Sequence, residues 1–431
     1  HCHCARAAIN TCRSSGSGPC RRLSSRPCVL TDNFVTHAHM HDPEWLLPAD
    51  ACDAACLSTD SMEQLNRDCF CIGVDPNALH TELEALLSSH GVPAALATSH
   101  PHLFSALPVY VARAHIERVG AVVAAVERVV ALPAYRAAAL AWAPDIARHD
   151  PGSPGGLLGL DFHLGPDGPR LIEINTNPGG ALLNVLLAQA QRICMPAITA
   201  PPTDPVKAED AVLASLLAEW EGQRPAAPLR FVAIVDEAPH AQYLYPEFVL
   251  YRELLRRHGM RAEICAPGEL VARAGRLWWH DEPVDLVYNR LTDFALQAPA
   301  HAALREAYVA GQVALTPHPR AHALYADKRN FALLGDGAFL AAAGADADAT
   351  ATLAAAVPRT RRVTPENRDT LWTERRDLFF KPAAGFGSKA SYRGDKLTRR
   401  VWEEIAQGEY VAQALVAPSV RRLASGGGAL K

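Results

Sequence analysis

The stretch GLDFHLGPDGPRLIEINTNPGG, residues 159–180, decides the fold of this chain. It predicts a β-hairpin, with one strand through Asp161, a Gly-Pro-Asp-Gly turn at 165–168 and a second strand through Glu173. Folding about that turn brings Asp161 opposite residue 172 or 173. The hairpin therefore sets two carboxylates close together.

Strand alternation gives the hairpin a polar and an apolar face. Glu173 shares a face with Leu171 and Asn175, because successive side chains point to opposite sides. The other face is apolar and carries Leu160, Phe162, Ile172 and Ile174. Two carboxylates and an amide offer the hard oxygen ligands that Mg²⁺ takes together with substrate phosphates. The sequence thus predicts a magnesium site at Asp161, Glu173 and Asn175; the alternative is a solvated hairpin with an acidic face.

A second segment, FFKPAAGFGSKASYRGDK at 379–396, combines a short apolar strand with a glycine-rich loop. Lys381 leaves the strand, and the loop that follows contains Gly385, Gly387, Ser388 and Lys389. Glycines let backbone N–H groups approach phosphate oxygens, and lysines add charge. The spacing matches neither a Walker A loop nor the GxGxxG pattern, so a flexible surface hairpin is an equal alternative.

A third segment, GEYVAQALVAP at 408–418, predicts a short strand. It carries Glu409 and Gln413, side chains that can hydrogen-bond an adenine or a ribose.

Together these segments resemble the ATP-grasp superfamily, in which two lysines, a glycine-rich lid and a hinge strand hold ATP. In that superfamily an acidic hairpin ending in Glu-x-Asn holds Mg²⁺ and comes last. Here it comes first, and the lysines follow at Lys328 and Lys381. The order resembles circularly permuted ATP-grasp proteins related to glutathionylspermidine synthase. EINTNPGG, HALYADKRN, KPAAGFGSK and EYVAQALV carry the resemblance, which extends over residues 60–431.

The resemblance implies an α+β or α/β ATP-grasp fold in permuted order, with a helical N-terminal part and a small parallel-sheet pre-ATP-grasp domain. It implies an ATP- and Mg²⁺-dependent ligase that joins small-molecule or peptide carboxylates to amines through an acyl-phosphate. Lys328 and Lys381 would contact phosphates, and the loop at 385–389 would cover them. Gln413 and the backbone at 414–415, including Leu415, would read adenine.

The resemblance also suggests residues for the substrate. Arg290 and Arg320, at the ends of the preceding domain's last strands, are candidates to hold the substrate carboxylate, with surface salt bridging as the alternative. His163 is interpreted as a wall residue rather than a base. Two other functions share the nucleotide residues: an ATP-dependent kinase, and a non-catalytic nucleotide-binding relic or scaffold.

Composition restricts the class of protein. The chain has 431 residues, of which 49% are hydrophobic and 20% charged, with a net charge of −4. This charge disfavours a nucleic-acid partner, which needs a basic surface. No apolar run is long enough for a transmembrane helix, so we expect no membrane association and a cytoplasmic location.

Both ends of the chain are unusual. Nine of the 11 cysteines lie in the first 71 residues, and the His-Cys-His-Cys start invites a zinc interpretation, but paired CxxC units are missing. We expect residues 1–58 to form a disordered or non-native extension, and buried inert thiols at Cys69 and Cys71. The resembling family has a further strand, with an Asp and an Arg facing the phosphates, after the hinge. We expect the chain, which stops at SGGGALK, to be truncated there.

Pro and Gly residues, which interrupt helices and strands, predict where the elements and domains begin and end. We expect helices within 76–150, at 181–192 and at 207–221, then a linker at 222–228. The segments FVAIVD, 245–258, AEICAP and DLVYNR alternate strand and helix, which predicts a parallel sheet. A lid follows at 329–416, in which 345–356 is expected to be a loop leading into a helix. The predicted domains are 1–58, 59–225, 229–320 and 321–431.

Overall fold

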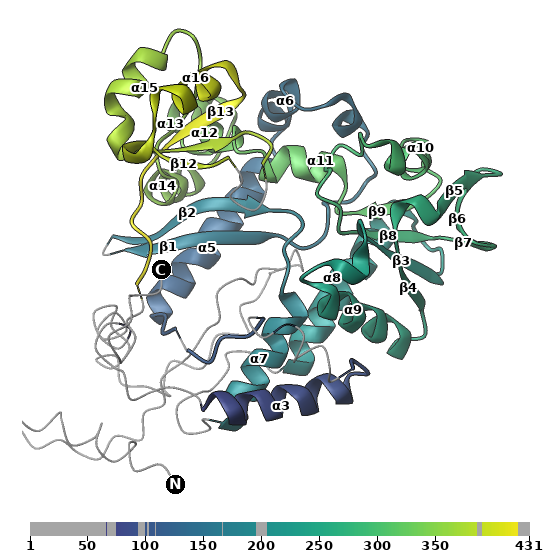
Figure 1. Ribbon diagram of the computed structural model, residues 1–431. Helices are drawn as coiled ribbons and strands as arrows, with labels where there is room; N and C mark the ends of the chain where they lie inside the picture. Colours follow the sequence, from purple (N-terminus) through teal and green to yellow (C-terminus); the bar gives the residue numbers. More distant parts are fainter. Residues whose placement is uncertain are drawn as a thin grey trace, which may run out of the picture.

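A computed structural model of the protein describes residues 66, 75–93, 100, 103–107, 109–165, 167–194, 205–385 and 390–420. It is a mixed α/β structure that combines parallel and antiparallel sheets (Figure 1). The predicted extension at 1–58 lies outside the described residues, as do Gly387, Ser388 and Lys389. No described helix combines enough length with enough apolar character to span a bilayer.

The first described part is helical, as the sequence predicts. Helix α3 (Pro76–Ser89) begins after Asp75, whose carboxylate accepts hydrogen bonds from the backbone N–H groups of residues 77 and 78. Its buried face repeats every fourth residue and carries Leu79, Leu83 and Leu87. Helices α5 (Arg113–Val130) and α6 (Pro133–Ala141) follow.

The predicted hairpin is present as β1 (Gly159–Gly165) and β2 (Gly168–Asn175). Asp161 pairs with Glu173, while the next pair is Phe162 with Leu171. Ile172 is therefore an extra residue, a β-bulge that shifts the register of β2 by one position.

This bulge corrects the predicted faces of the second strand. Leu171 is 0% exposed and belongs to the buried cluster that also holds Leu160 and Ile174, whereas Ile172 is only partly buried and lies outside that cluster. Simple alternation placed Ile172 inside and Leu171 beside Glu173. An inserted residue reverses the alternation beyond it, so Leu171 takes the apolar position.

Helices α8 (Pro205–Gln223) and α9 (Tyr245–Arg257) pack against a parallel sheet, and α7 (Ala181–Cys194) packs on both of these helices. Helices α7 and α8 agree with the predicted ranges, and α9 follows the first strand of the sheet. Residues of all three helices share one buried cluster with the sheet.

The parallel sheet has the strand order β4–β3–β8–β9. Its strands are β3 (Phe231–Val235), β4 (Arg261–Cys265), β8 (Leu286–Asn289) and β9 (Ala314–Thr316). All five residues of β3 are buried, which is typical of a strand covered on both faces. The three predicted strands are confirmed, and β9 is an addition too short for the sequence to indicate.

A small antiparallel sheet extends beyond β4, at the right of Figure 1. It consists of β5 (Leu270–Arg273), β6 (Arg276–Trp279) and β7 (Glu282–Pro283), and α10 (Ala302–Val309) packs against it. The sequence did not predict these strands, because two to four residues are too few for alternation to be recognised.

The C-terminal part forms an antiparallel sheet with the order β10–β13–β11–β12. Its strands are β10 (Thr360–Arg362), β11 (Leu378–Pro382), β12 (Tyr392–Arg393) and β13 (Tyr410–Ala414). Its helices are α12 (Asn330–Leu334), α13 (Gly337–Ala342), α14 (Ala347–Ala356), α15 (Arg368–Glu374) and α16 (Arg399–Gln407). The segment 345–356, expected to be a loop leading into a helix, is helical from residue 347, and Asp346 caps α14 at Ala349.

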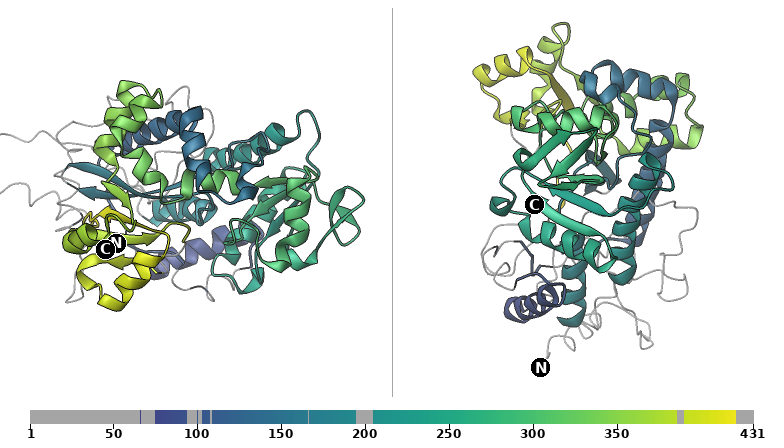
Figure 2. Two further views of the ribbon diagram at one scale, coloured as in Figure 1. Left: turned by 90° about the horizontal axis from the view of Figure 1, so that it is seen from above. Right: turned by 90° about the vertical axis from the view of Figure 1, so that its right-hand side faces the viewer.

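The hairpin and the C-terminal segment that carries Lys381 lie side by side, although they are far apart in the sequence. The yellow C-terminal sheet lies next to the blue hairpin, whereas the parallel sheet lies on the other side of the molecule (Figures 1 and 2). Beyond β13 the chain runs along β1: the His163 ring Nδ1 lies 3.0 Å from the Val416 carbonyl, and the Leu164 N–H donates to Ser419 Oγ at 3.0 Å.

The position of the bulge predicts how two substitutions change the stability of the protein. Leu171→Ala should lower the free energy of unfolding by about 2–5 kcal/mol, because it empties a fully buried position. The matched variant Ile172→Ala should cost about 1 kcal/mol, because that side chain is partly in solvent. Chemical denaturation measures both. An equal or larger cost for Ile172→Ala would contradict the observed register.

Candidate functional site

Lys381 joins the C-terminal sheet to the hairpin. It lies in β11, its side chain is buried, and its Nζ donates to the Ile172 carbonyl at 2.7 Å and to Gln413 Oε1 at 3.0 Å. Ile172 is the bulge residue, so the ammonium contacts the backbone where the hairpin ladder is interrupted. This contact links positions 209 residues apart in the sequence.

The three predicted metal ligands lie together on the hairpin. Asp161 and Glu173 are paired across the strands, and the Asn175 Nδ2 donates to Asp161 Oδ2 at 3.2 Å. The bulge is the reason, because without it Asp161 would pair with Ile172 and Glu173 would point to the opposite face.

Lys328 completes this charged cluster. It follows a π-helical turn, η8 (His322–Ala326), a geometry often found at functional sites. Its Nζ lies 3.0 Å from Glu173 Oε1 and donates to the Gly385 carbonyl at 2.8 Å. Lys328 therefore connects the acidic face of the hairpin with the start of the glycine-rich loop.

Burial tunes the charge of Lys381. Removal from water lowers the pKa of Lys381 to about 8, and Lys328 adds to this effect, whereas Glu173 and Asp161 oppose it. The ammonium is charged at neutral pH and loses its proton in mildly alkaline solution.

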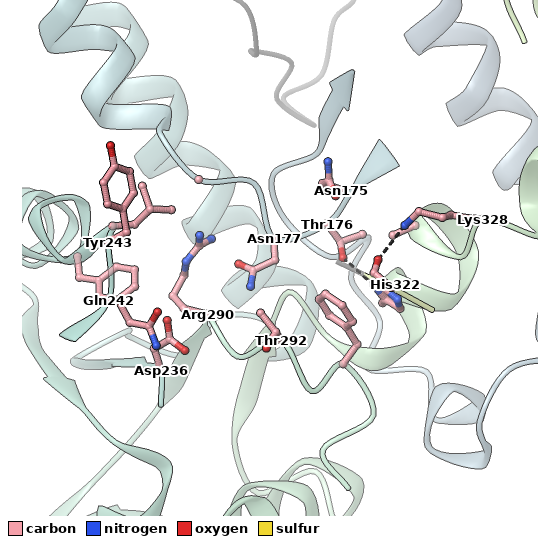
Figure 3. Close-up of a pocket in the computed structure, with 16 residues that line it drawn as sticks. Asn175, Thr176, Asn177, Asp236, Gln242, Tyr243, Arg290, Thr292, His322 and Lys328 are labelled. Carbon is pink, nitrogen blue, oxygen red and sulfur yellow. Dashed lines mark hydrogen bonds between the residues drawn. The ribbon is translucent and has the colours of Figure 1, made fainter. Parts of the chain in front are cut away.

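A cavity of about 420 Å³ adjoins this cluster. Four segments line it: the end of the hairpin at 175–179, the segment 236–248 after β3, the segment 290–294 after β8, and the turn at 322–328, together with Gly385. Figure 3 shows Lys328 and Asn175 at one end and Asp236 at the other. The cavity thus leads from Lys328, in the charged cluster, to the carboxyl ends of the parallel strands. Ligands of such sheets usually bind at these ends.

The loop after the hairpin is fixed from two sides. Arg290, which is buried, donates from Nη1 to the Pro178 carbonyl at 2.9 Å. Glu247, also buried, accepts hydrogen bonds from the N–H groups of Gly180 at 2.7 Å and Leu182 at 3.1 Å. These contacts hold the loop that carries the cavity-facing residues 175–179.

Two glycines of this loop occupy positions that disfavour larger residues. A Cβ on Gly179 would lie 2.2 Å from Leu244 Cδ1, so a larger residue would require the Leu244 side chain to move. Gly180 has a φ of +91°, in the region that favours glycine.

Asp236 is placed directly after the buried strand β3. Burial raises the pKa of Asp236 to about 6, although its hydrogen bond from the Glu237 N–H and the charge of Arg290 oppose the change. The carboxylate is ionised at neutral pH and becomes neutral in mild acid.

His322 forms a flat aromatic wall of the cavity. Its ring stacks on Phe294, with centroids 3.7 Å apart and planes 8° from parallel. Its Nδ1 lies 3.5 Å from Thr176 Oγ1, and its Nε2 is buried with no hydrogen-bond partner in the described part of the chain. Burial and the charge of Lys328 lower the pKa of His322 to about 3.

The structure does not bring every predicted site residue to the cluster. Arg320 pairs with Asp150 at 3.1 Å and does not line the cavity, whereas Arg290 lines it. The role of either arginine toward a substrate stays a prediction. Glu409 has a side chain that is 72% exposed and pairs with Arg329 at 3.1 Å.

The hinge residues are engaged within the protein. Gln413 is buried, its Oε1 accepts from Lys381 and its Nε2 lies 3.3 Å from Thr360 Oγ1. The Leu415 N–H donates to the Asp377 carbonyl at 2.8 Å. In this arrangement the Gln413 amide positions Lys381, and its contact to adenine stays a prediction.

Sequence reasoning missed Asp236, Glu247 and His322. Asp236 had a signal, because it ends an apolar strand of a predicted parallel sheet. Glu247 and His322 had none: one is a single acid at the start of an amphipathic helix, and the other is defined by a ring stacked on it from another segment.

Comparisons with known proteins add little to this geometry. No protein-family model matches the chain, and no curated protein matches it. Among solved structures, it is similar to a glutathione synthetase-like effector from Globodera pallida in its apo form. The two are 14% identical, with a TM-score of 0.49, over 80% of this chain and 83% of the other. A likeness this distant carries no argument about function.

The environment of His322 predicts its protonation state. Since its pKa lies near 3, the ring should remain neutral between pH 5 and pH 8. Histidine ring signals in an NMR titration, assigned by their loss in His322→Gln, measure this. A His322 signal that titrates near the ordinary value of about 6.5 would show that the ring is open to solvent.

Proposed function

We propose that this protein is an ATP- and Mg²⁺-dependent ligase that joins a carboxylate to an amine through an acyl-phosphate. One observation carries the proposal: Lys381 and Lys328, from the C-terminal part, converge on the carboxylate face of a hairpin from the other half of the chain. Two cations opposite hard oxygen ligands suit a polyphosphate with its divalent cation.

The hairpin has the donor set for Mg²⁺. Asp161, Glu173 and Asn175 provide two carboxylates and an amide on one surface, and Mg²⁺ commonly takes one or two carboxylates plus phosphate oxygens and water. Among the described residues, no group of three or more His, Cys, Asp or Glu side chains is arranged so that it could hold a metal ion. When bound, the cation would neutralise phosphate charge.

The residues present would act by position and charge. Lys328 would exchange Glu173 for a phosphate oxygen, and Lys381 would face the same group from the lid. In the first step a substrate carboxylate oxygen bonds to the γ-phosphorus and the bond to ADP breaks. In the second an amine attacks the acyl carbon, inorganic phosphate leaves, and the amine loses a proton to solvent.

Two alternatives share the nucleotide residues. A kinase would transfer the same phosphoryl group to a hydroxyl acceptor, and a relic would bind nucleotide without turnover. Hydroxylamine separates the three, because it converts an acyl-phosphate to a hydroxamate. With ATP, Mg²⁺ and a panel of carboxylates, a ligase forms ADP and a hydroxamate. A kinase forms ADP only when a hydroxyl acceptor is supplied, and it forms no hydroxamate. A relic forms neither product.

Removing either charge should stop turnover. We expect Lys381→Ala and Glu173→Gln to lower kcat for ADP release by about 10²-fold or more, because both roles are strongest in the transition state. The matched control Lys396→Ala changes an exposed lysine of the same C-terminal part and should keep parental activity. Parental turnover in both site variants, with unchanged melting, would show that the two residues are structural.

The pKa of Lys381 predicts a pH profile for nucleotide binding. The affinity for ADP should be level up to about pH 8 and then fall by up to about tenfold per pH unit, because the free protein must take up a proton to restore the ammonium. Lys381→Arg stays charged and should flatten the fall. Calorimetry from pH 7 to pH 9.5 measures both, and parallel profiles would contradict the role of Lys381.

A further inference from the structure

Arg290 presents an unused edge to the cavity. Its Nη1 is engaged by the Pro178 carbonyl at 2.9 Å and by the Tyr288 hydroxyl at 3.2 Å. Its Nε and Nη2 have no acceptor among the described residues, and the residue lines the cavity. Two parallel N–H donors on a fixed guanidinium match the two oxygens of a carboxylate.

Asp236 presents an unused oxygen at the same end. Its Oδ1 accepts a hydrogen bond from the Glu237 N–H at 2.8 Å, and within the described chain no donor reaches Oδ2. Asp236 and Arg290 affect each other electrostatically without forming a direct ion pair. Both line the same cavity, so one ligand in it can approach both charges.

The third charge at this end is already satisfied. Glu247 accepts two backbone N–H groups at the start of α7, where the helix dipole favours a negative charge, and it also interacts with Arg290. Among the described residues, Asp236 accepts a hydrogen bond from one backbone N–H and pairs with no cation directly. Of the two carboxylates near Arg290, Asp236 is therefore the one that a ligand cation would stabilise most.

These charges exclude simpler ligands. A dicarboxylate on Arg290 would bring a second negative charge close to Asp236, and a diamine would leave the Arg290 edge unpaired beside another cation. A carboxylate and an ammonium carried on one carbon match both residues. The remaining cavity continues past Asn177 and Thr292 toward Lys328 (Figure 3).

We propose that the Arg290–Asp236 end of the cavity binds the α-amino-acid group of a substrate, its carboxylate on Arg290 Nε and Nη2 and its ammonium on Asp236 Oδ2. The substrate is thus a free amino acid or a peptide with such a terminus, anchored here while its remaining part extends toward Lys328. The assignment of this molecule as a substrate rests on the proposed ligase function, but its binding does not.

Three related probes test the site without nucleotide. L-glutamate has both groups, glutarate lacks the ammonium, and 4-aminobutyrate lacks the α-carboxylate. Calorimetry should give L-glutamate an affinity at least about tenfold above either of the others, since each lost charged hydrogen bond is worth about that factor. Equal affinity for L-glutamate and glutarate, or no binding of any probe, would overturn the proposal.

Variants assign each group to its residue. Asp236→Asn keeps the contact to the Glu237 N–H and should lower L-glutamate affinity about tenfold while leaving glutarate unchanged. Arg290→Lys keeps a donor for Pro178 and should lower L-glutamate affinity similarly while leaving 4-aminobutyrate unchanged. Asp281→Asn, at a carboxylate 99% exposed, is the matched control and should bind as the parent. A loss in Asp236→Asn that is the same for L-glutamate and glutarate would reject the ammonium assignment.

The outcome is separable from that of the ligase proposal. If L-glutamate binds with the predicted variant pattern but no ATP-dependent product forms, the ligase proposal is wrong and the binding-site proposal is supported. ADP and hydroxamate formation with carboxylates that lack an amine, without selective L-glutamate binding, would keep the ligase function and remove the site.

Discussion

The contact between the Lys381 ammonium and the Ile172 carbonyl is the interaction on which the rest of the site depends. It forms at a β-bulge, and the bulge also turns Glu173 toward Asp161. One irregularity of the hairpin therefore creates the carboxylate pair and the acceptor for the lysine that lies over it. Because the lysine belongs to the C-terminal sheet, the same contact joins two halves of the chain.

Stability alone does not explain this cluster. Two lysines and two carboxylates lie partly or fully out of water, and charges buried in this way repay their desolvation only in part. The low pKa of Lys381 expresses that cost. A phosphate-bearing ligand would give the two lysines a further anionic partner, which would be a physical reason to keep an otherwise unfavourable arrangement.

The two ends of the cavity differ because they are formed by different parts of the fold. Asp236 directly follows β3 and Arg290 directly follows β8, so one end carries fixed charges on a rigid frame. The other end is formed by a π-helical turn and the loop that starts at Gly385. A neutral His322 stacked on Phe294 forms an uncharged wall at this second end.

The hairpin, its turn and the parallel strands could be predicted from the sequence, because each depends on local signals: Gly-Pro-Asp-Gly, alternation, and apolar runs such as FVAIV. The pairing of Asp161 with Glu173 could be narrowed to two registers and no further, since a bulge leaves no mark on composition. Leu171 and Ile172 exchange places for this reason. Only the tertiary structure decided that Arg290 faces the cavity while Arg320 pairs with Asp150, and that Gln413 supports Lys381. These outcomes depend on contacts between segments far apart in the chain, where the partner, rather than the residue itself, determines the role.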